Sequence, residues 1–212
     1  MSVKPIFFAL DGKHLDNFSR ELEILKGNIY GVKVGLEMFT SEGPSSVEKL
    51  KKDGWTVFLD LKLHDIPNTV QAAAISAGNI GADYLTIHIA SGKEALLAAK
   101  ESKSENLKLL GVSSALTSKA YSPEISQKVY EEFLLAKESK IDGVICPPSE
   151  LVKTKELFEL IVTPGIRLKN DDSHDQKNIT TPEKAIRDGA SYLVMGRSIR
   201  QNINYVVEKL KL

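Results

Sequence analysis

The chain has 212 residues, of which 42% are hydrophobic, which suits one medium-sized domain with a substantial core. Lysine plus arginine and aspartate plus glutamate each number 28, so a net charge of zero gives no reason to expect nucleic acid or an anionic membrane as a partner. No apolar stretch approaches the roughly 20 residues needed to span a bilayer, and no signal peptide is predicted. The single Cys146 excludes an internal disulfide, so a cytoplasmic location is expected.

Short β-rich runs alternate with helical segments along the chain. Strands are predicted at residues 6–10, 31–34, 56–61, 84–87, 108–112, 143–146, 160–162 and 192–195. Between them, apolar side chains with helical spacing are expected to share one face. These sets are Phe18, Leu22 and Leu25; Val47 and Leu50; Ala95, Leu96 and Ala99; and Val129, Phe133, Leu134 and Ala136. Cys146 ends an apolar strand run, which favours an inert thiol over a nucleophile.

Several predicted strands follow a shared signal of aspartate and glycine. It reads Asp53-Gly54, Gly81-Ala82-Asp83, Asp142-Gly143 and Asp188-Gly189-Ala190. Glycine at these points is expected to end the preceding helix. Alternating βα units imply right-handed crossovers and a parallel sheet, and eight of them in 212 residues predict a single-domain (β/α)8 barrel (a TIM barrel) over residues 1–212. A doubly wound open sheet is the alternative, but Asp11-Gly12-Lys13-His14 after the first strand is not its glycine-rich fingerprint.

Charged residues gather at the ends of the second and third predicted strands. Asp60 and Lys62 are two residues apart and are expected on the same face, Asp65 follows the strand end, and Lys33 lies within strand two. Two lysines and two aspartates in one site would neutralise each other and could hold one proton donor against a reacting carbon. Each residue also has a structural alternative. Asp65 could cap the next helix with Pro67 in its first turn, Lys33 could be an edge-strand lysine, and Asp60 and Lys62 could form a structural pair.

The loops after strands seven and eight are a common phosphate site in such barrels. Gly196 lets the backbone approach an anion, and Arg197 can bind phosphate in a bidentate fork. Arg167 and Gln176 lie in the long loop after strand seven and could close over a ligand. For Arg197 the alternative is a surface arginine at a helix start.

Several segments together resemble the orotidine 5′-phosphate decarboxylase family of the bacterial type. The most specific is residues 58–70, FLDLKLHDIPNTV. The others, in chain order, are Ala9-Leu10-Asp11, residues 32–39, Leu116-Thr117-Ser118, residues 162–167, Asp175-Gln176 and Met195-Gly196-Arg197. Because the matches run in order from near residue 6 to near residue 200, they cover nearly the whole chain.

This resemblance implies a role for each matching residue. Lys62 would donate a proton to C6 of the pyrimidine, with Lys33, Asp60 and Asp65 completing the charged array. Asp11 and Lys33 would hold ribose hydroxyls, and Arg167, Gln176, Gly196 and Arg197 would surround the phosphate. Thr117 and Ser118 would face the pyrimidine or the closing loop. The family also implies a homodimer in which Asp65, Ile66 and Thr69 enter the partner's site, and catalysis without a metal or organic cofactor.

Some residues depart from the family pattern. Ser173-His174 and Lys177 stand where a glycine and an arginine are expected, and Ser113-Ser114 makes the approach to Leu116 unusually polar. Two other functions remain open. One is an Mg²⁺-dependent sugar-phosphate decarboxylase or aldolase-like enzyme of the same superfamily, which has an acidic residue where Lys33 stands. The other is a non-catalytic barrel that binds a phosphorylated ligand, which would tolerate loss of the charged array.

Overall fold

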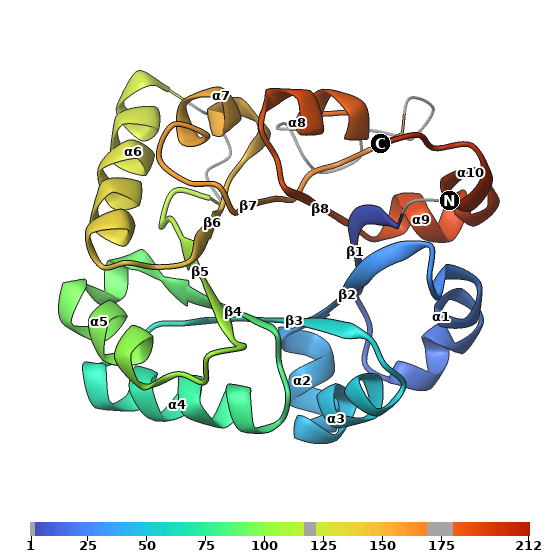
Figure 1. Ribbon diagram of the computed structural model, residues 1–212, viewed down its shortest axis with the longest axis horizontal. Coiled ribbons are helices and arrows are strands. Elements are labelled where there is room, and N and C mark those ends of the chain that lie inside the picture. Colours follow the sequence, from blue (N-terminus) through green and yellow to red (C-terminus); the bar gives the residue numbers. More distant parts are fainter. Residues whose placement is uncertain (1–2, 117–121, 169–179) are drawn as a thin grey trace.

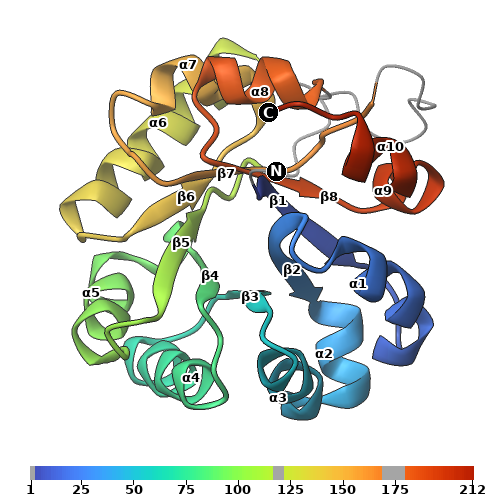
Figure 2. The same ribbon diagram turned by 45° about the vertical axis from the view of Figure 1, so that its right-hand side comes forward.

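The computed structural model describes residues 3–116, 122–168 and 180–212. In this part of the chain, parallel strands form one closed barrel in the order β1 to β8, and helices surround the ring of strands (Figures 1 and 2). The predicted (β/α)8 barrel is confirmed, and the alternative of an open doubly wound sheet is wrong. None of the described helices is long and apolar enough to cross a membrane.

The strands are β1 (Lys4–Leu10), β2 (Ile29–Gly35), β3 (Thr56–Leu63), β4 (Tyr84–His88), β5 (Lys108–Val112), β6 (Gly143–Ile145), β7 (Ile161–Thr163) and β8 (Tyr192–Met195). The α-helices are α1 (Ser19–Leu25), α2 (Leu36–Glu42), α3 (Pro44–Lys52), α4 (Pro67–Asn79), α5 (Lys93–Ser102), α6 (Pro123–Glu138), α7 (Leu151–Thr154), α8 (Pro182–Asp188), α9 (Arg197–Gln201) and α10 (Ile203–Glu208). Short 3-10 helices are η1 (Leu15–Phe18), η2 (Ile89–Ser91) and η3 (Pro148–Glu150).

The strand predictions differ from the structure mainly at the ends. β5 and β8 match their predicted ranges, whereas β3 continues past residue 61 to Leu63, so that Lys62 as well as Asp60 lies inside the strand. β6 stops one residue before Cys146, and β7 is shifted by one residue and includes the buried Thr163.

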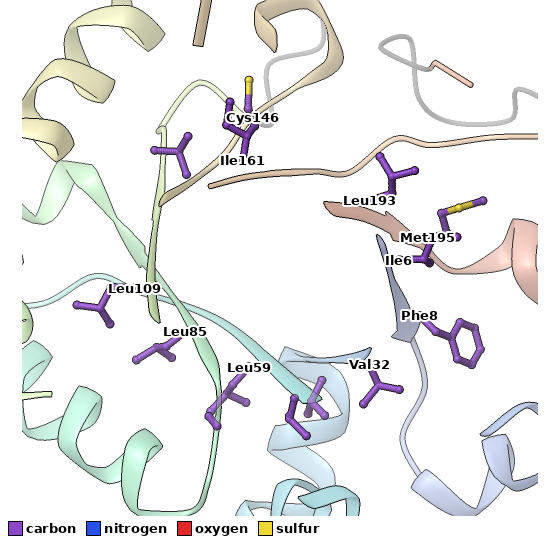
Figure 3. Packing of buried hydrophobic residues seen from close by; sticks show 14 of the residues in the cluster. Ile6, Phe8, Val32, Leu59, Leu85, Leu109, Cys146, Ile161, Leu193 and Met195 are labelled. Carbon is purple, nitrogen blue, oxygen red and sulfur yellow. The ribbon is translucent and has the colours of Figure 1, made fainter. Parts of the chain in front are cut away.

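The main hydrophobic core lies between the strands and the surrounding helices. Figure 3 shows strand residues such as Leu59, Leu85 and Leu109 pointing out of the ring, and buried helix residues pack against them. The predicted helix faces are largely confirmed, with one error: Leu134 in α6 is 36% exposed. Leu134 directly follows the buried Phe133, and one residue along a helix is a turn of about 100° away from the buried face.

Aromatic side chains fill the barrel interior near the amino ends of its strands. We call Phe7, Tyr30, Phe58, Tyr84 and Tyr192 the aromatic floor. The Tyr30 and Tyr192 rings stack with centroids 4.3 Å apart, Phe7 meets Phe58 edge-on at 5.4 Å, and the Tyr30 and Tyr84 hydroxyls are 2.8 Å apart. The interior at the amino ends of the strands is therefore a packed core.

Side chains that directly precede β4, β6 and β8 accept hydrogen bonds from backbone N–H groups near the start of β3, β5 and β7, respectively. The Asp83 carboxylate accepts from the Val57 N–H at 2.7 Å, and the Asp142 carboxylate accepts from the Leu109 N–H at 2.9 Å. Ser191 takes the same place before β8, where its hydroxyl accepts from the Ile161 N–H at 3.0 Å. Two aspartates of the repeated sequence signal, Asp83 and Asp142, therefore join neighbouring strands.

Glycine occurs in this sequence signal for two different structural reasons. Gly54 and Gly81 have φ angles of +75° and +90° just past α3 and α4, as expected of residues that end a helix. At Gly143 this expectation is wrong, since Lys140 takes the positive φ of 56° after α6. Gly143 begins β6, where a Cβ atom would lie 2.4 Å from the Leu160 carbonyl oxygen, so only glycine fits there.

Cys146 is completely buried directly after β6. Its Sγ lies 3.2 Å from the Thr154 hydroxyl. Burial raises the pKa of the Cys146 thiol to about 12, so the thiol stays protonated near neutral pH. The prediction of an inert thiol agrees with this environment, because the thiolate is the reactive form.

Candidate active site

A pocket of about 220 Å³ opens at the carboxyl ends of the strands, the end at which (β/α)8 barrels form their active sites. Charged side chains from the first three strands line one part of it, and loops after β7 and β8 line another. The pocket residues that carry charge or form these loops are Asp11, Lys33, Asp60, Lys62, Pro164, Gly165, Arg167, Gly196 and Arg197. Apolar walls come from Phe58 of the aromatic floor, Leu116, Ile145 and Val194.

Asp60 and Lys62 of β3 form a bidentate pair at the centre of the charged part. The Lys62 Nζ donates to both Asp60 carboxylate oxygens at 2.8 Å. The Asp60 side chain is 13% exposed and that of Lys62 is 31% exposed, so the pair is shielded from water while the ammonium still reaches the pocket. The predicted juxtaposition is confirmed.

A bulge in β3 produces this juxtaposition, rather than simple alternation of side chains. The pairing of β3 with β4 shifts between Leu59 and Leu63, while β4 advances only from Leu85 to Ile87. Within the bulge Lys62 has a φ of +50°. A non-glycine residue in this region stores roughly 1–3 kcal/mol of strain and is typical of functional sites. Bulges are known to redirect a side chain beside an active site.

Lys33 of β2 lies between two carboxylates. Its Nζ is 3.5 Å from Asp11 Oδ1 and 3.5 Å from Asp60 Oδ2, and its side chain is only 12% exposed. The barrel is closed and β2 pairs with both β1 and β3. Because β2 is therefore not an edge strand, the alternative of an edge-strand lysine is wrong. Asp11, Lys33, Asp60 and Lys62 thus form a continuous row of alternating charges.

The electrostatic environment keeps Asp60 ionised. Burial raises the pKa of Asp60, but attraction by Lys33 and Lys62, with hydrogen bonds from Lys62 and Thr86, outweighs burial and leaves that pKa below its usual value. At neutral pH the carboxylate therefore only accepts hydrogen bonds. It holds a full negative charge beside the ammonium of Lys62.

Asp65, Ile66 and Thr69 do not line the pocket of their own chain. The Asp65 carboxylate accepts from the N–H of Ile66 at 2.7 Å, and the Ile66 side chain is 65% exposed. The N-cap of α4 is Ile66, with Pro67 in the first turn. The alternative of Asp65 as the helix cap is therefore wrong, although its expectation for Pro67 is correct.

Arginine and glycine residues occupy the predicted phosphate end. Arg167, Gly196 and Arg197 all line the pocket, and the side chain of Arg197 is exposed. A Cβ atom on Gly196 would lie 3.0 Å from Asp11 Oδ2, so glycine keeps this part of the pocket open. The helix that begins at Arg197, α9, has only five residues, and the arginine side chains are accordingly the main source of positive charge here.

The loop after β5 is fastened by Glu132 of α6. The Glu132 carboxylate accepts from the Ser113 hydroxyl at 2.5 Å, from the Ser114 hydroxyl at 2.6 Å and from the Ser114 N–H at 2.9 Å. This contact gives the unusually polar Ser113-Ser114 a structural role next to Leu116 in the pocket wall. Three predicted site residues, Thr117, Ser118 and Gln176, lie outside the described residues, as do Ser173, His174 and Lys177.

Two residues around the site were not predicted from the sequence. Glu132 has no local signal, because it is 18 residues from Ser114 along the chain. Thr86 of β4 donates from its hydroxyl to Asp60 Oδ1 at 3.0 Å and accepts from the Lys62 N–H at 2.8 Å. The sequence gives only an indirect indication of this role for Thr86. It lies two residues after Tyr84 in the predicted fourth strand, so both side chains face the inner side of the barrel, beside strand three.

The closed barrel and the charged pocket at the carboxyl ends of its strands define a (β/α)8-barrel enzyme. A sequence model described as the "Orotidine 5′-phosphate decarboxylase / HUMPS family" matches residues 4–210. The chain belongs to this family.

Individual relatives agree with this assignment. An orotidine 5′-phosphate decarboxylase from Fusobacterium nucleatum is 40% identical in an alignment of 219 positions that covers 95% of this chain and 91% of the relative. One from Halalkalibacterium halodurans is 38% identical in an alignment of 215 positions that covers 93% of this chain and 92% of that relative. The crystal structure of orotidine 5′-phosphate decarboxylase from Lactobacillus acidophilus has a TM-score of 0.78 and 33% identity, covering 93% of this chain and 92% of that one.

Proposed function

We propose that the chain decarboxylates orotidine 5′-monophosphate to uridine 5′-monophosphate, and that residues 1–212 form one catalytic domain. The observation that carries the proposal is the row of alternating charges in which Lys62 is bonded to Asp60 and Lys33 lies between Asp60 and Asp11. Family membership adds independent support.

The chemistry explains why this row of charges is needed. When the bond between C6 and the carboxylate breaks, the electron pair remains on C6 in an orbital perpendicular to the ring π system, so the ring cannot delocalise it. Lys62 stabilises the developing charge as a nearby cation and then transfers a proton from Nζ to C6. Asp60 orients Lys62, and Asp11 and Lys33 hold the ribose hydroxyls. No metal or organic cofactor takes part.

The phosphate end supplies binding energy at a distance from the reacting carbon. Arg167, Gly196 and Arg197 hold the phosphate, with Gln176 closing over it, while Thr117 and Ser118 face the pyrimidine or the closing loop. Energy from such remote groups can drive closure and desolvation around C6. This division of roles explains how one small ring can be held firmly enough for a demanding reaction.

Replacing Arg197 tests the phosphate end. Arg197→Ala should weaken the binding of uridine 5′-monophosphate at least about tenfold, because a hydrogen bond to a charged group contributes roughly 1.5–3 kcal/mol. Binding of uridine, which lacks the phosphate, should be nearly unchanged. Arg200→Ala is the matched control on the same helix, since Arg200 bonds Glu21 at 2.9 Å and does not line the pocket. Calorimetric titration with both ligands measures the effect, and equal losses for both would show that Arg197 does not bind phosphate.

We further propose a cytoplasmic homodimer with shared active sites. Asp65 is absent from the pocket of its own chain, and the large side chain of Ile66 in the same loop is 65% exposed. Both observations support a loop that enters the partner's site with Asp65, Ile66 and Thr69. The single buried Cys146 suits a reducing compartment.

A spectrophotometric assay with orotidine 5′-monophosphate in the presence of EDTA tests the activity directly. We expect full turnover in EDTA, because the Lys33 ammonium lies where a cation would otherwise sit between the carboxylates. Activity that collapses with EDTA would favour the Mg²⁺-dependent sugar-phosphate enzyme instead. Folded protein that binds uridine 5′-monophosphate without turnover would favour the non-catalytic barrel.

A further inference from the structure

Thr86 is completely buried in β4, next to the β3 bulge. It does not line the pocket, so it is not placed to touch a substrate. Its hydroxyl accepts from the Lys62 N–H at 2.8 Å and donates to Asp60 Oδ1 at 3.0 Å. The direction of both bonds is fixed, because an N–H can only donate and an ionised carboxylate can only accept. A single hydroxyl thus connects the backbone of Lys62 with the side chain of Asp60.

The bulge makes this connection necessary. Between Leu59 and Leu63 the regular pairing with β4 is interrupted, so the Lys62 N–H needs an acceptor other than the usual backbone carbonyl. The Thr86 hydroxyl supplies it. Lys62 also has a φ of +50°, a conformation that persists in a non-glycine residue only where the surroundings determine it. Thr86 is the side chain that holds this backbone.

We infer that Thr86 is a positioning residue, whose hydroxyl fixes Lys62 and Asp60 relative to each other for the proton transfer to C6. The inference rests on the proposed decarboxylation. The backbone of Lys62 has a strained conformation. The Lys62 ammonium and the Thr86 hydroxyl both donate hydrogen bonds to the Asp60 carboxylate. Loss of the hydroxyl frees both the backbone and the carboxylate, and small displacements of a reacting group are costly for the rate.

Comparing four different residues at position 86 distinguishes the effect of the Thr86 hydroxyl from that of its methyl group. Threonine has both groups, Thr86→Val keeps only the methyl, Thr86→Ser keeps only the hydroxyl, and Thr86→Ala has neither. We expect kcat to follow the hydroxyl. The kcat of Thr86→Val should be about tenfold to a hundredfold below that of the wild type, and the kcat of Thr86→Ala should be below that of Thr86→Ser by the same factor. This is the range expected for loss of a hydrogen bond to a charged group. The affinity for uridine 5′-monophosphate should stay within about threefold, because the product has no carboxylate beside Asp60.

The measurements are kcat with orotidine 5′-monophosphate per folded molecule, product affinity by calorimetry, and thermal unfolding. If Thr86→Val does not fold, the comparison of Thr86→Ser with Thr86→Ala gives the same test. Equal kcat values with and without the hydroxyl would overturn the inference, as would a loss of product affinity as large as the loss of kcat. A folded wild-type protein without decarboxylase activity would instead overturn the proposed function.

Discussion

Lys62→Ala is expected to reduce kcat by at least a hundredfold while the barrel remains folded. The Lys62 ammonium is the proton source next to C6 in the proposed reaction, and loss of general acid catalysis alone typically costs roughly 10²–10⁴-fold. The measurement is steady-state turnover of orotidine 5′-monophosphate, together with thermal unfolding of the variant. A variant that retains more than about a hundredth of the wild-type kcat would contradict the role given to Lys62.

Lys51→Ala is a matched control for this experiment. The Lys51 Nζ bonds both oxygens of Asp83 at 2.8 and 2.6 Å, and its side chain is 31% exposed, the same fraction as that of Lys62. Lys51 does not line the pocket. Both substitutions remove a half-buried ammonium from a bidentate pair, so a loss of kcat in Lys62→Ala alone would separate catalysis from a general effect on stability.

Mixing Lys62→Ala protein with Asp65→Ala protein should restore activity that neither variant has alone. If Asp65 enters the partner's site, a mixed dimer has one site with both defects and one site with neither. Random exchange makes half of the dimers mixed, so recovery should approach about a quarter of the wild-type activity. Turnover is measured after subunit exchange, which mass spectrometry verifies. Activity that stays at the level of the parents after exchange would mean that Asp65 acts within its own chain.

A second mixture controls for non-specific recovery. Lys33 and Lys62 line the pocket of the same chain. A mixed dimer of Lys33→Ala and Lys62→Ala chains therefore has one defect in each site and no intact site. We expect no recovery from this pair, so restored activity there would point to a source other than shared sites.

The sequence could predict which residues meet at the site because a parallel barrel brings all carboxyl strand ends together. The pocket brings together residues from distant parts of the chain: Asp11, Lys33, Asp60, Arg167 and Arg197. The position of each residue in or just after its own strand was sufficient to predict that it lies at the site. The apolar runs and glycine signals fixed the strand order for the same reason. Such features depend on local sequence and on a fold whose connections follow simple rules.

The bulge at Asp60 and Lys62 could not be predicted from the sequence. Its register depends on how β3 pairs with β4, and the Thr86 hydroxyl that accommodates it is 24 residues from Lys62 along the chain. Gly143 shows the same limit, since only the approach of the Leu160 carbonyl explains why a side chain is excluded there. Asp65 does not line the pocket of its own chain, and a place for it in an active site was expected only from the family resemblance.

The side-chain bonds that join neighbouring strands have a consequence for how the chain folds. Val57 and Asp83, Leu109 and Asp142, and Ile161 and Ser191 are 26, 33 and 30 residues apart, whereas Lys4 bonds Val207 across 203 residues. Closing the longer loop costs about 1.7 kcal/mol more entropy, since each doubling of loop length adds about 0.6 kcal/mol. We therefore expect three βαβ modules to form early from local contacts, and the contact of β1 with α10 to form late.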